Sequence, residues 1–297
     1  MIFSRDTRLT EGRKTRVSPA NRIRLASKVA GLAVSAVLLA LMAGPAYSTA
    51  TVPQVKVHDT AGMFADAPAS IKWGKPAWAD TFNGTELNLK RWTVYDDPTG
   101  KYSGWKRTLQ SVKVHDGSLE IIGHYQRPYG YVGGGLSYNL NQTYGRWAVR
   151  FRADSGSGWE PVVLLWPKGK WPDDGEIDMA EISNPSRHGA GEFVHLGAKN
   201  QQVGQPIPSS ADFTKWHILA VDWLPSHITF WLDGKPLWTI KRAKGRRNFI
   251  PSTPFHLAMQ NDVGCATHLC KPNKSTPRRV IMQVDWIRIW TAPAGAR

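Results

Sequence analysis

The sequence predicts an all-β protein built from antiparallel sheets, as a sandwich or a barrel. From Trp78 onward, short segments carry apolar residues at every second position, and turn residues separate these segments. No segment after residue 48 has the apolar spacing of a helix of about ten residues or more. Many short strands at regular spacing, without helices between them, are typical of sandwiches and barrels.

The strands themselves are predicted from alternation and from the turns that end them. We expect strands within residues 111–125, 144–154, 160–167, 216–242 and 280–290. The first and fourth of these segments contain Asp-Gly pairs at 116–117 and 233–234, which favour hairpin turns. The third is a continuous apolar run after Glu160, as in a strand covered on both faces. Together the segments indicate a single domain over residues 78–292.

The first 48 residues are predicted to be a secretory signal peptide. Residues 1–28 hold eight Lys or Arg against two acidic residues, and the uncharged segment 29–43 follows. That segment has 15 residues, whereas a membrane span needs about 20. Small residues then provide a cleavage site after Ser48 or Ala50. An uncleaved anchor is the alternative, and residues 49–77 are interpreted as a linker or irregular lead-in.

The net charge and the cysteines indicate which partners and which redox compartment suit the mature chain. The net charge is +15, of which +6 lies in residues 1–48, so about +9 remains after export. A secreted basic protein can adhere to anionic cell-wall polymers, whereas scattered Lys and Arg do not indicate nucleic-acid binding. Cys265 and Cys270 are expected to form a small disulfide loop in an oxidising compartment. No metal or cofactor is expected, and the 14 Trp suit sugar binding.

The segment WPDDGEIDMAEIS, Trp171 to Ser183, carries a row of acidic residues. On a regular strand, Glu176 and Asp178 share a face and Glu181 points the other way. Exposed acids are usually a solvated face, but the apolar residues between them favour a buried strand. A β-bulge near Ala180 would bring all three acids to one face. The carboxyl groups of Glu176 and Glu181 could then approach to about 5–5.5 Å, the separation in retaining glycosidases.

The motif GEIDMAEI resembles the Glu-x-Asp-x-x-Glu signature of glycoside hydrolase family 16, in its bulged laminarinase-like form. Other segments resemble the family in the family's order: 82–96, 116–121, 144–152, 216–237 and 284–290. This resemblance covers residues 78–292 and implies a concanavalin A-like β-jelly roll, with two curved antiparallel sheets and a cleft on the concave face. It implies that Glu176 is the nucleophile, Glu181 the acid/base and Asp178 an assisting residue.

The resemblance also suggests substrate-binding residues. His195 resembles a cleft histidine, Trp171 and Trp105 resemble subsite aromatics, and Gln260 resembles a cleft amide. Packing roles are the alternatives for His195 and Trp171, and Trp166 is expected in the core.

One segment departs from the family pattern. SGWEPVVLLWP has Glu160 between Trp159 and Pro161, where the family commonly has GxWPAFWLLP, so the resemblance leaves the polysaccharide open. The function expected is that of a secreted, monomeric, retaining endo-β-glycanase, with β-1,3-glucan as the best single guess. A transglycosylase using the same site, a non-catalytic β-glucan-binding protein and a wall-binding structural protein are the alternatives.

Overall fold

The computed structural model describes residues 71–242, 244–245, 248–265 and 271–296. These residues all belong to one compact unit, Val57–Arg297. The predicted signal peptide and most of the lead-in lie outside the described residues, and so does Cys270. The disulfide between Cys270 and Cys265 therefore stays a prediction. Within the described ranges, no helix has the length and apolar character needed to cross a bilayer.

Two antiparallel sheets make up the described part of the chain. The first has nine strands: β1 (Trp78–Asp80), β3 (Val112–His115), β4 (Ser118–Gln126), β5 (Gly130–Val132), β7 (Gly145–Ala153), β12 (His217–Trp223), β13 (His227–Leu232), β14 (Lys235–Lys241) and β16 (Arg279–Thr291). The second has seven strands: β2 (Trp92–Val94), β6 (Gly134–Tyr138), β8 (Trp159–Pro167), β9 (Glu176–Glu181), β10 (His188–Leu196), β11 (Gln201–Asp212) and β15 (Phe255–Val263). Two short 3-10 turns, η2 (Leu109–Ser111) and η3 (Ala294–Ala296), complete the described elements.

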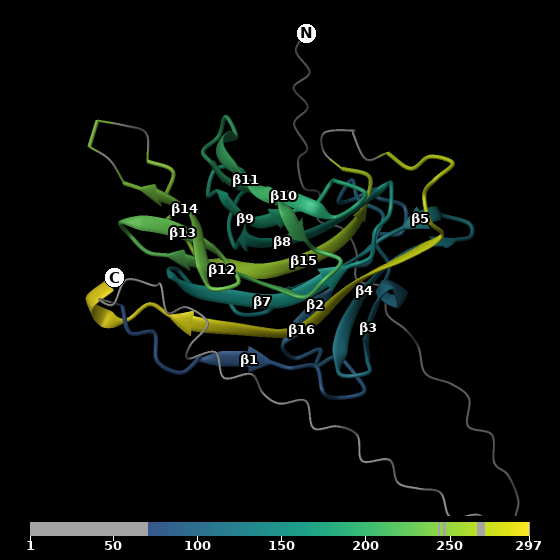
Figure 1. Ribbon diagram of the computed structural model, residues 1–297, viewed down its shortest axis with the longest axis horizontal. Helices are drawn as coiled ribbons and strands as arrows, with labels where there is room; N and C mark the ends of the chain where they lie inside the picture. The colour runs from purple at the N-terminus through teal and green to yellow at the C-terminus, as the bar shows by residue number, and fades with distance from the viewer. Residues whose placement is uncertain (1–70, 243, 246–247, 266–270, 297) are drawn as a thin grey trace, which may run out of the picture. The chain divides into compact units, whose positions relative to one another are not determined.

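The chain passes back and forth between the sheets. Strand β7 lies in the first sheet, β8 to β11 run consecutively in the second, β12 to β14 return to the first, and β15 and β16 enter one sheet each (Figure 1). Both final strands are inserted between earlier ones: β15 lies between β8 and β6, and β16 between β7 and β4. This two-layered antiparallel arrangement is a β-jelly roll and confirms the predicted fold class.

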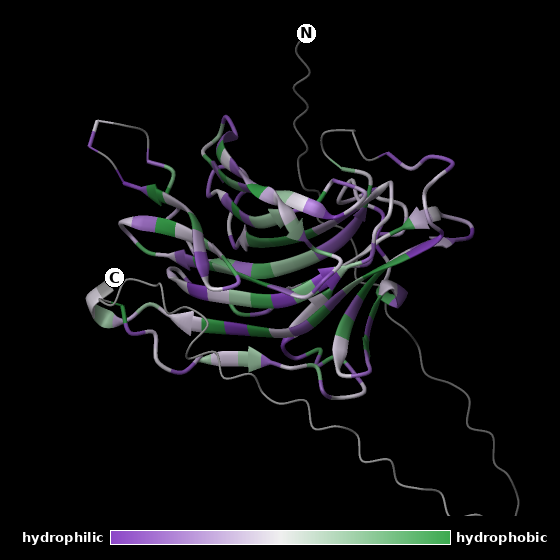
Figure 2. Ribbon diagram, viewed as in Figure 1, coloured by the Kyte–Doolittle hydropathy of each residue, from purple (hydrophilic) through white to green (hydrophobic). Residues whose placement is uncertain are grey.

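The main core fills the space between the sheets. Alternate residues of each strand point into it, and Figure 2 shows the resulting alternation of apolar and polar positions along the strands. Strand β8 shows how one strand serves two environments. Val163 and Leu165 belong to the main core, whereas Val162 and Leu164 form a separate apolar cluster with Ala258 on the other face of the second sheet. That other face carries the candidate site.

Most of the tryptophan excess that suggested sugar binding serves packing instead. Five tryptophan side chains are among the largest that are fully buried: Trp92, Trp147, Trp159, Trp223 and Trp231. A further cluster on the outer face of the first sheet contains Trp231, Trp286 and Trp290. Large aromatic side chains supply much of the apolar area that a sandwich needs. Only a minority of the tryptophans therefore remains available to a ligand.

Candidate active site

A β-bulge in β9 places the three acidic side chains of the row on one face. Against β8, Ala180 lies opposite Val163 and Asp178 lies opposite Leu164, so Met179 is the extra residue. The pairing with β10 shifts at the same point. Met179 and Ala180 are consecutive, yet both are fully buried in the main core. The bulge predicted near Ala180 is therefore confirmed.

The cross-strand partners show that the acids lie on the face of the second sheet turned away from the main core, which we call the cleft face. Glu181 lies opposite Val162, and Asp178 lies opposite Leu164. Both partners belong to the apolar cluster outside the main core, and directly opposed residues share a face of the sheet. On the next strand, His195 lies opposite Glu176. The row predicted from the motif is thus assembled on one surface of the second sheet.

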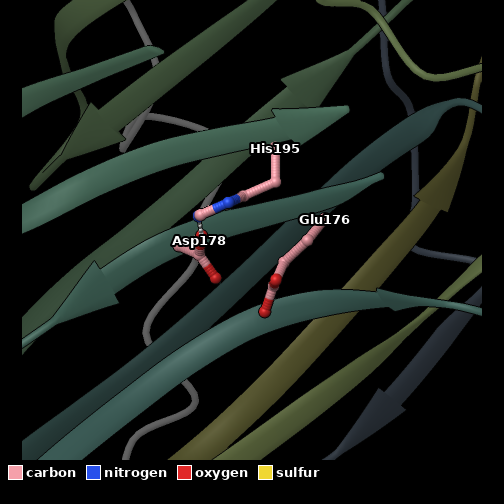
Figure 3. Close-up of side chains that lie close together, drawn as sticks. All are labelled: Glu176, Asp178 and His195. Atoms are coloured by element: carbon pink, nitrogen blue, oxygen red, sulfur yellow. Dashed lines mark ion pairs between the residues drawn. The ribbon is translucent and has the colours of Figure 1, made fainter. Parts of the chain in front are cut away.

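His195 joins the acidic row from the neighbouring strand. Its Nε2 lies 3.3 Å from Oδ2 of Asp178, and its Nδ1 lies 2.9 Å from Oδ1 of Asn200. Figure 3 shows the imidazole extending from its strand toward Asp178, with the Glu176 side chain on the same side of the sheet. A contact at each ring nitrogen fixes the orientation of the imidazole. His195 is therefore placed in the site, as predicted from its strand.

Burial and mutual repulsion control the charge of the row. Burial, and then the negative charge of Asp178, raise the pKa of Glu176 to about 9, while His195 and the Trp171 N–H oppose the shift. Burial followed by the charge of Glu181 raises the pKa of Asp178, and burial raises the pKa of Glu181. Neighbouring buried carboxyl groups cannot all ionise. At neutral pH the row therefore holds fewer negative charges than carboxyl groups, which allows one anion to lie beside one acid.

Two stacked indoles form one wall of the site. Trp171 Nε1 donates a hydrogen bond of 2.7 Å to Oε2 of Glu176, and 41% of Trp171 is exposed. Its ring stacks on Trp166, with 5.8 Å between centroids and 14° between planes. The prediction that Trp166 lies in the core is wrong. Trp166 lies opposite His256 and packs on the cluster of Val162 and its neighbours, because alternation along β8 directs it to the cleft face.

A second group of side chains contains Trp105 and Gln260, linked through Arg107. The Arg107 guanidinium lies over the Trp105 ring at 5.9 Å and over Tyr95 at 5.2 Å. Its Nη2 donates to Gln260 Oε1 at 2.5 Å, and its Nε and Nη2 donate to the two carboxylate oxygens of Asp262 at 2.7 Å each. The two binding residues predicted here are thus close together, and their roles stay predictions.

Sequence reasoning missed the residues that connect this group. Arg107 and Asp262 are 155 positions apart in the sequence, so no local spacing relates them. The available signal was periodicity: Asp262 is two residues after Gln260, which places both on one face of β15. The same rule places Glu160 two residues before Val162, on the cleft face of β8.

Three side chains of the site have the composition of a cation site. Glu176, Asp178 and His195 each offer one ligand atom, and these atoms lie within 4.8 Å of one another. The same spacing also suits carboxyl groups and an imidazole that share protons. A glycosidic bond can be cleaved by the row in this second way, and we assign no ion to it.

The fold and the site define a class of protein: a β-jelly roll whose cleft carries a bulged strand with three carboxyl groups beside exposed tryptophan. The profile of the family described as "Glycosyl hydrolases family 16" matches residues 73–288. The chain belongs to this family, which confirms the resemblance seen in the motif.

Individual relatives agree with this membership. The chain is 25% identical over 253 residues to a glucan endo-1,3-beta-glucosidase A1 from Niallia circulans, an alignment that covers 72% of the chain and 37% of the relative. It is 31% identical over 145 residues to a beta-glucanase from Rhodothermus marinus, with 42% and 49% covered. The alignments thus span less than half the length of these two relatives.

Solved structures share the fold. The catalytic domain of a Thermotoga petrophila endo-1,3-beta-glucanase superposes with a TM-score of 0.66 at 19% identity, covering 75% of this chain and 99% of that one. A laminarinase from Rhodothermus marinus gives a TM-score of 0.64 at 22% identity, with the same shares covered. At these identities the likeness concerns the fold alone.

Proposed function

We propose that the protein is a secreted, retaining endo-β-glycanase that cleaves a neutral polysaccharide, with β-1,3-glucan as the first substrate to test. The observation that supports this most is the bulge at Met179, because it gathers Glu176, Asp178 and Glu181 on one face. Family membership and the endo-1,3-glucanase relatives support the reaction class. Secretion rests on the predicted signal peptide, and the expected state is a monomer.

The proposed reaction has two displacements. The reactive form of the row is the one in which Glu176 is ionised and Glu181 holds a proton, and a pKa of about 9 for Glu176 makes this a minor form at neutral pH. In the first displacement, the Glu176 carboxylate attacks the anomeric carbon while Glu181 gives its proton to the departing glycosidic oxygen, so a covalent glycosyl-enzyme forms. In the second, Glu181 takes a proton from water, which attacks the anomeric carbon and releases Glu176. Asp178 and His195 lie beside the nucleophile and adjust its charge. Trp171 orients the Glu176 carboxylate through its N–H.

The charge of the cleft favours a neutral glycan. Glu160 and Asp262 extend the acidic row on β8 and β15, and the Arg107 guanidinium is already paired with Asp262. Sulfate or uronate groups would meet the negative charge that the acidic row retains at neutral pH, and like charges at close range disfavour binding. The net charge of the whole chain is positive, and adherence to anionic wall polymers stays a proposal.

A pocket next to Glu181 favours transglycosylation as a second candidate reaction. It has a volume of about 510 Å³ and is lined by Glu181, Asn184, His188 and the edge strand around Ile207. A cavity of this size can hold a small ligand such as a sugar unit. A sugar hydroxyl bound there could replace water in the second displacement. The products then distinguish the reactions, since transfer lengthens some chains and hydrolysis does not.

The test is reducing-sugar release from laminarin, mixed-linkage β-glucan, xyloglucan, agarose and carrageenan. We expect release from a neutral β-glucan, none from carrageenan, and losses of at least about 100-fold in kcat for Glu176→Gln and Glu181→Gln. A wild-type protein that binds one polysaccharide tightly but cleaves none would favour the non-catalytic binding protein and refute the hydrolase. If Glu176→Gln retained full activity, the assigned nucleophile would be wrong.

A further inference from the structure

Glu160 occupies a position on the cleft floor that the reaction above does not use. It lies directly opposite Asp262 on β15, and two residues further along β8 Val162 lies directly opposite Glu181. Alternation puts Glu160 on the face of Val162 and Leu164, whereas its neighbour Trp159 is fully buried. Only 7% of Glu160 is exposed. This acid is therefore both buried and adjacent to the proposed acid/base.

Among the described residues, no group of the protein forms a hydrogen bond or an ion pair with the Glu160 carboxyl, although the side chain is only 7% exposed. The neighbouring Asp262 is already paired with Arg107. The charge of Arg187 acts on Glu160, but the N–H groups of Arg187 donate to main-chain carbonyls, among them those of Trp159 and Ile182. The side chain is thus largely buried, yet its carboxyl oxygens are not among the fully enclosed atoms that lack a partner, so a ligand lying on this face can reach them.

The state of the carboxyl group indicates which ligand fits. Burial, followed by the negative charges of Glu181 and Asp262, raises the pKa of Glu160 to about 9. The group is therefore protonated at neutral pH and offers one O–H donor together with acceptor oxygens. A sugar hydroxyl has the matching pair, one donor and lone pairs that accept.

We propose that Glu160 is a specificity-determining residue that hydrogen-bonds a hydroxyl group of the neutral sugar bound over β8 beside Glu181. This inference rests on the proposed function and refines it, because it names the group that selects the substrate at one position of the cleft. Recognition at this position is polar, in contrast to the stacking that Trp171 and Trp166 offer.

The experiment compares Glu160→Leu and Glu160→Gln with wild type on the polysaccharide that wild type cleaves best. Leucine keeps the approximate size and removes the polar atoms, whereas the glutamine amide retains a donor and an acceptor. We expect Glu160→Leu to lower kcat/KM by about 5- to 10-fold, mainly through KM, and Glu160→Gln to stay within about twofold. The control is Glu120→Gln, a buried acid of β4 in the other sheet, which should match wild type in KM.

Thermal denaturation separates binding from a purely structural role. Glu160→Leu should not lower the melting temperature, because it removes a buried carboxyl group without a partner. If wild type is active and Glu160→Leu leaves KM within twofold, the inference is overturned while the proposed function stands. Equal losses in both variants, together with lower melting temperatures, would also overturn it. If wild type cleaves none of the polysaccharides, the proposed function fails and the inference falls with it. Should Glu160→Leu not fold, Glu160→Met provides the same comparison.

Discussion

Replacing Trp171 with phenylalanine tests how the proposed nucleophile is held. The change keeps an aromatic ring next to Trp166 and removes the N–H that donates to Glu176 at 2.7 Å. A hydrogen bond to a charged group contributes about 1.5–3 kcal/mol. Because 41% of Trp171 is exposed, the lower end applies, and about 1.5 kcal/mol corresponds to roughly a tenfold loss in kcat/KM.

The pH profile gives this prediction a second readout. The Trp171 N–H stabilises the charged form of Glu176 and so lowers the pKa of that carboxyl. Without it the pKa rises, less of the nucleophile is ionised at a given pH, and the acidic limb of kcat/KM moves to higher pH. The assay is the kcat/KM profile of Trp171→Phe, with Trp238→Phe of β14 as the control outside the cleft. An unchanged rate together with an unmoved acidic limb would refute the reasoning.

Three further predictions concern the framework around the site. Arg187 is fully buried and donates hydrogen bonds to five main-chain carbonyls. Arg187→Met should therefore lower the free energy of unfolding, measured by urea titration, by about 3–5 kcal/mol, and a loss below about 1 kcal/mol would contradict this. Burial raises the pKa of Glu192 from 4.5 to about 8. Between these two pH values the folded state keeps a proton that the unfolded state releases, so the free energy of unfolding falls as the pH rises from 4.5 to about 8. Glu192→Gln should therefore weaken the pH dependence of the urea midpoint by an amount on the order of 1–3 kcal/mol, and a slope equal to that of wild type would argue against it. The Asp97 carboxylate accepts hydrogen bonds from three backbone N–H groups and so holds the loop before Trp105 in place. Asp97→Ala should therefore raise KM several-fold with little change in kcat, and an unchanged KM would exclude a binding role for that loop.

The arrangement of the acidic row could be predicted because it depends only on residues that are neighbours within one strand. Alternation along a strand decides which neighbours share a face, and the apolar residues Ile177, Met179 and Ile182 could all be buried only if one residue was inserted. Consecutive residues therefore contain enough information to place the bulge and to bring Glu181 beside Asp178. The predicted separation of about 5–5.5 Å between the Glu176 and Glu181 carboxyl groups stays a prediction.

The faces of individual strands were predicted less well where both faces are apolar. Strand β8 is apolar on each side, so its sequence does not show which residues meet the core and which meet the cleft. The sequence predicts Trp166 in the core, whereas the register against β15 directs it outward to stack on Trp171. Large aromatic side chains suit either environment, and only the neighbouring strand distinguishes the two.

By itself, the sequence determined the all-β class, the hairpins, the bulged acidic strand and the family, because each depends on residues that are close in the chain or on a short motif. The tertiary structure alone decided what surrounds the acids. Arg107 meets Asp262 across 155 positions, and Glu160 meets Asp262 only because β15 enters the sheet beside β8. Strand order is set by burial of the whole sandwich rather than by any local pattern, so the walls of the cleft, and with them its selectivity, depend on the assembled fold.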